Sequence, residues 1–177
     1  MMSGLLKRLR SDERGAAIIE LAIIAPVFAL MTVGIVDMSN AFGRKLALEQ
    51  GAQRAIEKVM QTTGETDVAD TIKTEAVCQI NGVNPDSSCK SSPITADDVT
   101  VTYRLECTDS GGAITNQTST DAAAFDDFYC ATGTVTEAKY IQVAIVDTYT
   151  PLFPIHFAAI NGDGTYHLSA IAGMRTK

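Results

Sequence analysis

A short segment of the sequence, residues 14–20, combines the groups that a proteolytic cut and an ion pair between subunits would need. Gly15 ends a basic leader, Ala16 begins an apolar run, and Glu20 follows the glycine by five positions inside that run. A glycine lets the backbone extend into a protease cleft without a side chain in the way. A cut after Gly15 would free the α-amino group of Ala16, whose ordinary pKa of about 7.7 to 8 keeps it largely cationic near neutral pH.

Glu20 needs a physical reason, because a lone ionised residue in a membrane-spanning helix costs about 2.5 to 3.5 kcal/mol. If such helices pack side by side with an axial stagger, Glu20 of one subunit meets the new amine of another, and two costly charges form one pair. The alternative is that Glu20, within two turns of Arg14, extends toward the water outside the membrane. The spacing from Gly15 and the polar leader favour the pairing.

The element that must carry these residues is a membrane-spanning helix, predicted over residues 16–36. Glu20 is the only charge in these 21 residues, which as a helix would be roughly 31 Å long, close to the thickness of a bilayer's hydrocarbon core. Basic residues precede the run and Asp37 is the first charge after it, which predicts a cytoplasmic N-terminus and an exported remainder. Pro26 is expected to kink the helix, the alternative being a tolerated membrane proline without a role.

All four cysteines follow this helix, on the side where an exported chain forms disulfides: Cys78, Cys89, Cys107 and Cys130. The even number predicts two bridges. Three connectivities are possible, and short loop closure favours Cys78 with Cys89 and Cys107 with Cys130. No pair has the close spacing of a zinc site, so no metal is expected.

The charge balance argues against nucleic-acid binding. The chain has a formal charge of −7, and loss of residues 1–15, with four basic and two acidic residues, would lower it to −9. An acidic domain without a basic stripe repels phosphate backbones.

Catalysis is not expected either. The sequence has two histidines, His156 and His167, but no nucleophile elbow or phosphate loop, and His167 fits a position on a sheet face. We therefore predict no enzyme activity, no cofactor and no small-molecule substrate. Two groups of carboxylates lack the loop spacing of a calcium site and are interpreted as solvated surface: Asp97 and Asp98, and Asp121, Asp126 and Asp127.

The helical pattern continues beyond the membrane run. The apolar residues Phe42, Leu46, Ala52, Ile56 and Val59 or Met60 recur at spacings of three, four or six, with charged residues mostly between them. This spacing predicts one helix over residues 16–60, with half of it outside the membrane. A break is expected over residues 61–66.

The rest of the chain alternates in a way that predicts an α+β fold. A second short helix is expected over residues 67–77, strands over residues 99–105, 139–150 and 165–173, loops over 81–93 and 108–120, and a turn over 161–164. The fold expected is a long N-terminal helix packed on a small antiparallel sheet of about three strands, within a disulfide-bonded exported domain. The divisions are a cytoplasmic leader (1–15), a transmembrane helix (16–36), its extramembrane continuation (37–62) and the exported domain (63–177).

Several positions along residues 14–56 agree with one pattern of charge, proline and glycine: Arg14-Gly15, Ile19-Glu20-Leu21-Ala22, Pro26, Gly34-Ile35-Val36-Asp37, Ala41-Phe42, Arg44, Leu48, and Gly51-Ala52 before Arg54. This segment resembles the TadE-like family of the tight-adherence (Flp) pilus system. The segment Tyr149-Thr150-Pro151-Leu152 and a last strand running to Arg175 are also similar to the tail of TadE-like proteins.

The resemblance implies a minor pilin or pseudopilin that takes part in assembly of a type IV-like Flp pilus. Gly15 is then the prepilin peptidase cleavage position, Ala16 the mature N-terminus and Glu20 the assembly carboxylate. The implied partners are other pilin subunits, the peptidase and an inner-membrane assembly platform, with a single span in the bacterial inner membrane. The alternative is an uncleaved, single-span anchored protein of the cell envelope that binds another component. The pilin-like function requires cleavage after Gly15, whereas the anchored protein predicts that a bulky residue can replace Gly15 without consequence.

Overall fold

The computed structural model describes residues 13–61, 68–153 and 161–176, with only the backbone for residues 13–16. The elements are α2 (Glu13–Gln61), α3 (Val68–Asn81), the 3-10 turn η1 (Ala96–Asp98), β1 (Val99–Asp109), β2 (Ile114–Ser119), α4 (Ala122–Asp126), β3 (Thr134–Tyr149) and β4 (Tyr166–Arg175). Most of the predicted leader, the predicted break over residues 62–66 and His156 lie outside the described residues.

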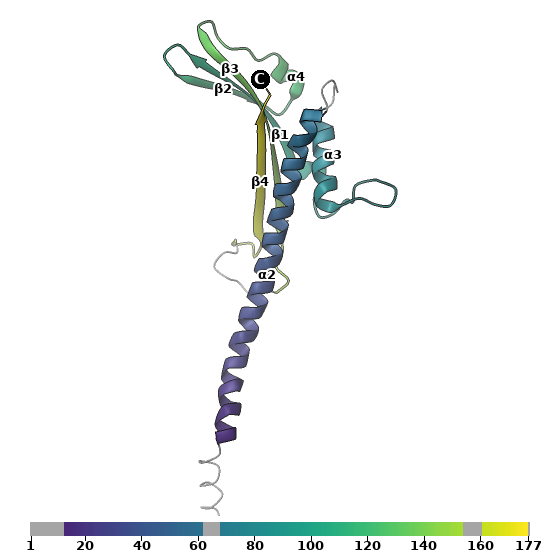
Figure 1. Ribbon diagram of the computed structural model, residues 1–177, viewed down its shortest axis with the longest axis vertical. Coiled ribbons are helices and arrows are strands. Elements are labelled where there is room, and N and C mark those ends of the chain that lie inside the picture. The colour runs from purple at the N-terminus through teal and green to yellow at the C-terminus, as the bar shows by residue number, and fades with distance from the viewer. Residues whose placement is uncertain (1–12, 62–67, 154–160, 177) are drawn as a thin grey trace, which may run out of the picture.

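The long helix α2 dominates the molecule, and its N-terminal half projects well beyond the sheet and α3 (Figure 1). It is continuous over 49 residues and includes Pro26 without an interruption of the helix. Its C-terminal half packs against α3, β3 and β4. The predicted α+β fold, with a long apolar helix and a small antiparallel sheet, is therefore confirmed.

The sheet has four antiparallel strands in the order β2-β1-β3-β4. The three predicted strands are present and longer than expected. Burial alternates along β1, and the register places Val101 opposite Val143 and Val143 opposite Ala172. Period-two alternation is what puts one side of each strand into the core, so the hydrophobic pattern identified the right face of these strands.

The prediction of a loop over residues 108–120 is wrong, because this region contains β2. The strand has the sequence Ile-Thr-Asn-Gln-Thr-Ser and is exposed along almost its whole length. It pairs with β1 alone, at the edge of the sheet. An edge strand that buries neither face carries no apolar alternation, so the sequence offered no period-two signal for the fourth strand.

The apolar residues that predicted the outer half of α2 as a helix are only in part the ones that pack on the domain. Phe42 is 66% exposed and Leu46 54% exposed, and Met60 is exposed as well. The side that packs on the domain is narrower and built from small residues around one leucine: Ala41, Leu48, Ala52, Ala55 and Ile56. Small side chains let the helix approach its neighbours closely, so size rather than hydrophobicity marks this face.

The core lies between α2, α3 and one face of the sheet, and its completely buried side chains include Leu48, Ile72, Leu105, Val143 and Ile145. Two disulfides reinforce it. Cys78 in α3 is bonded to Cys89 in the following loop, and Cys107 in β1 to Cys130 after α4. This is the connectivity with the shorter loops.

Candidate assembly and membrane-boundary site

The first half of α2 presents an apolar surface that nothing in the described chain covers. No residue between Ala17 and Val36 is buried among the described residues, and the exposed side chains include Ile19, Leu21 and Phe28. The helix is long and apolar enough to cross a membrane. Because a helix satisfies its own backbone hydrogen bonds, such a segment is stable in lipid but costly in water. This helix could therefore span a membrane.

The predicted cleavage position and the predicted assembly carboxylate lie near the beginning of α2. Gly15 and Ala16 have helical backbone, and Glu20 is exposed beside Ile19 and Leu21. Ala16 and Glu20 are four residues apart, so they lie on one face of the helix, separated by a rise of about 6 Å. Among the side chains that the structure describes, Glu20 makes no ion pair. Its carboxylate is open to a partner from outside the chain.

A feature that the sequence did not reveal lies at the other end of the apolar run. Asp37 is only 2% exposed, and its carboxylate accepts hydrogen bonds from the backbone N–H of Leu152 at 2.8 Å and of Phe153 at 3.3 Å. A buried charge is tolerated when it is hydrogen-bonded, and bonds to a carboxylate are stronger than those between neutral groups. Asp37 therefore fastens the segment after β3 to the helix. No local pattern could predict this contact, because the partners are 115 positions apart.

Two turns further along α2, a second pair of polar contacts holds the same strands. The guanidinium of Arg44 donates to the carboxylate of Asp147 in β3 at 2.6 Å. The ammonium of Lys45 donates to the backbone carbonyl of Ser169 in β4. Asp37, Arg44 and Lys45 thus form a polar row that fixes the β3–β4 hairpin along the helix.

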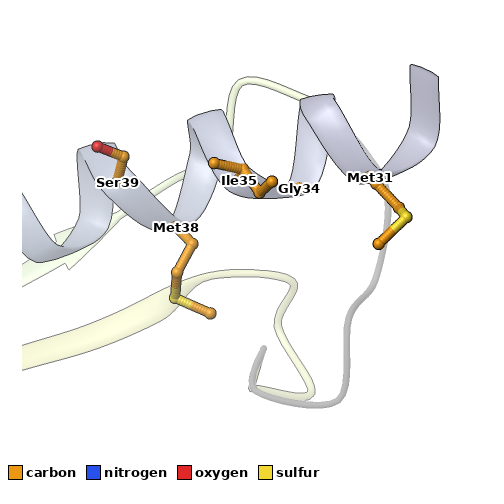
Figure 2. Close-up of a pocket in the computed structure, with 5 residues that line it drawn as sticks. All are labelled: Met31, Gly34, Ile35, Met38 and Ser39. Carbon is orange, nitrogen blue, oxygen red and sulfur yellow. The ribbon is translucent and has the colours of Figure 1, made fainter. Parts of the chain in front are cut away.

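An apolar hollow lies beside this row, on the part of α2 that includes Asp37. It is lined by Met31, Gly34, Ile35, Met38 and Ser39 and has a volume of about 490 Å³. Figure 2 shows Met31 and Met38 pointing to the same side of the helix, one on each side of Gly34 along the chain. None of the described residues that line the hollow is charged, so this lining suits an apolar group rather than an ion.

The two predicted histidines do not form a site. His156 lies outside the described residues. The imidazole Nε2 of His167, exposed on β4, lies 2.6 Å from the carboxylate of Asp163. Hydrogen bonds from the hydroxyl and the backbone N–H of Thr165, with that contact to His167, lower the pKa of Asp163 from 3.8 to about 2. Within the described ranges, no three His, Cys, Asp or Glu side chains gather as metal ligands.

The comparisons with known proteins agree with the resemblance seen in the sequence. The TadE-like protein family matches residues 15–56, about a quarter of the 177 residues. No curated protein matches the chain, and no solved structure matches it. The resemblance of residues 14–56 to the TadE-like family is therefore confirmed over residues 15–56. The matched segment suggests a pilin-like protein associated with the tight-adherence pilus.

Proposed function

We propose that this chain, which carries the TadE-like segment, is a minor pilin or pseudopilin that is cleaved after Gly15 by a prepilin peptidase and then takes part in assembly of a tight-adherence pilus. The observation that carries the proposal is the family match over residues 15–56, which includes Gly15 and Glu20. In this proposal residues 1–15 are a cytoplasmic leader, residues 16–36 span the inner membrane, and residues 63–177 form an exported domain.

The exposed part of α2 beyond Asp37 supports assembly over a solitary anchor. Phe42 and Leu46 are mostly exposed, and they lie about 7.5 Å and about 13.5 Å beyond Asp37 along the helix axis. In a solitary anchor, lipid would cover the residues before Asp37 but would not reach Phe42 and Leu46. With Phe28, Met31 and Ile35 these residues share one side of α2 at spacings of three, four and seven. A neighbouring subunit's helix would cover the whole stripe.

The first experiment determines the mature N-terminus. The protein is recovered from bacterial membranes that contain the native peptidase, and its intact mass and N-terminal sequence are measured. We expect a chain that begins at Ala16. The Gly15→Leu variant should retain its leader, since a bulky side chain hinders the protease cleft. A wild-type chain that retains residues 1–15 would favour the uncleaved anchored protein instead.

The second experiment tests the charge of Glu20. In Glu20→Leu the predicted membrane-spanning segment, residues 16–36, loses its only charge and should insert as well as wild type or better, yet incorporation with other pilins should be lost. Asp97→Leu is the control, because Asp97 is an exposed carboxylate in η1, outside α2 and its apolar stripe, and this variant should assemble normally. Co-purification with the other pilins and sedimentable filaments are the measurements.

The opposite outcome, normal assembly of the Glu20→Leu variant, also has a physical explanation, which depends on the position of Ala16. Because Ala16 and Glu20 lie on one face of α2, the carboxylate of a cleaved chain is also close to the amine of its own helix. If Glu20→Leu were to assemble at the wild-type level, the pairing between subunits would be wrong, and pairing within one helix would account for the tolerated charge.

A further inference from the structure

A second apolar surface lies far from α2 in sequence but beside it in space. Leu152 is 65% exposed and Phe153 is 40% exposed, and both follow Pro151 at the end of β3. From Thr148 to Gly162 the sequence contains no Asp, Glu, Lys or Arg. We call Leu152 and Phe153 the tip. An exposed leucine next to an exposed phenylalanine is costly in water, so the tip is more stable in an apolar environment.

The hydrogen bonds of Asp37 set the height of this tip along the helix. The backbone nitrogen of Leu152 lies 2.8 Å from the carboxylate of the residue that directly follows the apolar run. In Figure 1 the segment after β3 lies beside the middle of α2, where the helix leaves the sheet. Leu152 and Phe153 are therefore at the level where a membrane-spanning α2 would emerge from the lipid.

We propose that Leu152 and Phe153 form a second contact with the bilayer. They insert next to α2, at the membrane surface on the exported side. This inference rests on the membrane-spanning role proposed above for α2. Apolar side chains that insert at this depth bind the boundary between headgroups and acyl chains. With two points of attachment instead of one, the domain would be held at a fixed tilt over the membrane.

Lipid fits this tip better than a protein partner does. The tip offers apolar side chains, and Val36, the residue directly before Asp37 on α2, is apolar and exposed too. The backbone N–H groups of Leu152 and Phe153 are already bonded to Asp37, so the backbone here has little left to offer a protein ligand.

The absence of tryptophan from the sequence makes a direct test possible. Phe153→Trp places a single fluorophore at the tip, and Leu152→Trp places one at the more exposed neighbour. Tyr129→Trp is the control, because Tyr129 is highly exposed and follows α4, at the opposite end of the sheet (Figure 1). Each full-length protein is reconstituted in nanodiscs at one copy per disc, with ordinary or acyl-brominated lipids.

We expect both tip variants to emit at shorter wavelength than the control and to lose emission in brominated lipid, with little loss for Tyr129→Trp. Equal quenching of tip and control would overturn the proposal. Shielding of the tip only in discs that hold several copies would overturn it too, in favour of a contact between subunits. Flotation with vesicles tests the membrane anchor separately from the contact of the tip with lipid. A protein that floats but shows an unquenched tip contradicts this contact alone, whereas a protein that does not float contradicts the membrane anchor itself.

Discussion

The two halves of α2 share one continuous backbone and differ in what surrounds them. From Ala17 to Val36 the helix is apolar apart from Glu20 and Thr32 and has no buried residue, whereas from Asp37 to Gln61 one narrow side is buried against α3 and the sheet. A helix that is hydrophobic all round belongs in an apolar solvent, and one with a single buried stripe belongs at a protein surface. The change occurs at Asp37, the buried carboxylate that also fastens the hairpin.

Large exposed apolar residues therefore have different roles in the two halves of α2. In the first half, under the proposed function, lipid or a neighbouring helix covers the large exposed residues. In the second half the large exposed residues Phe42 and Leu46 contribute little to the fold, and small buried residues contribute most. Substitutions can therefore separate folding from assembly along a single helix.

The largest expected effect on folding is at Leu48, which is completely buried in the core. Leu48→Ala should lower the free energy of unfolding of the domain by about 2 to 5 kcal/mol, because it removes packed methyl groups and leaves a cavity. Leu46→Ala, two residues away on the exposed side, should change it by less than about 0.5 kcal/mol. Guanidinium unfolding of the full chain in mild detergent measures both. Equal losses would mean that the two sides of α2 are not distinct.

The next effect concerns the polar row. Arg44→Ala leaves the carboxylate of Asp147, whose side chain is only 9% exposed, without its guanidinium. We expect a loss of about 1 to 3 kcal/mol in the free energy of unfolding, since an unpaired buried group retains its desolvation cost. Arg54→Ala removes exposed ion pairs with Glu57 and Glu75 and should cost about 0 to 1 kcal/mol. The same unfolding assay applies, and a larger loss at Arg54 would contradict this ranking.

A smaller effect, with a sign that depends on position, is expected at two glycines of α2. A Cβ on Gly51 would lie 2.5 Å from the side chain of Ile80 in α3, so Gly51→Ala should cost about 1 to 3 kcal/mol from overpacking. The better helix propensity of alanine returns about 0.5 to 1 kcal/mol. Nothing lies within 4 Å of a Cβ on Gly43, so Gly43→Ala should be stabilising by that amount. Thermal unfolding of the two variants should shift in opposite directions.

The smallest effect is expected at Asp163, in the exposed turn between β3 and β4. Its pKa is lowered to about 2 by hydrogen bonds from Thr165 and by His167. Since the folded-state pKa is below the ordinary value, the ionised carboxylate stabilises the fold above about pH 4, and this contribution is lost as the pH falls toward 2. An NMR titration of the Asp163 carboxyl should show a midpoint near 2. Asp163→Asn should remove this part of the acid dependence, and a midpoint near 3.8 would show that the turn hydrogen bonds are not maintained.

Much of the fold could be predicted because its signals are local. Period-two alternation located β1, β3 and β4, and helical spacing with few breaks located α2 and α3. The edge strand β2 was not predicted, because none of its residues is buried and its sequence has no apolar alternation. For the candidate site, the sequence identified the TadE-like segment that the family comparison matched, while the roles of Gly15, Ala16, Glu20 and Pro26 stay predictions.

The sequence by itself determined that one long apolar helix leads a small disulfide-bonded α+β domain, because hydropathy, alternation and cysteine number are properties of neighbouring residues. Only the tertiary structure decided which side of the helix is buried, since Ala41, Ala52 and Ala55 gain their importance from the strands and α3 packed against them. It also decided that Asp37 binds the backbone of Leu152 and Phe153. That contact joins residues more than a hundred positions apart, and only the folded chain brings them within hydrogen-bonding distance.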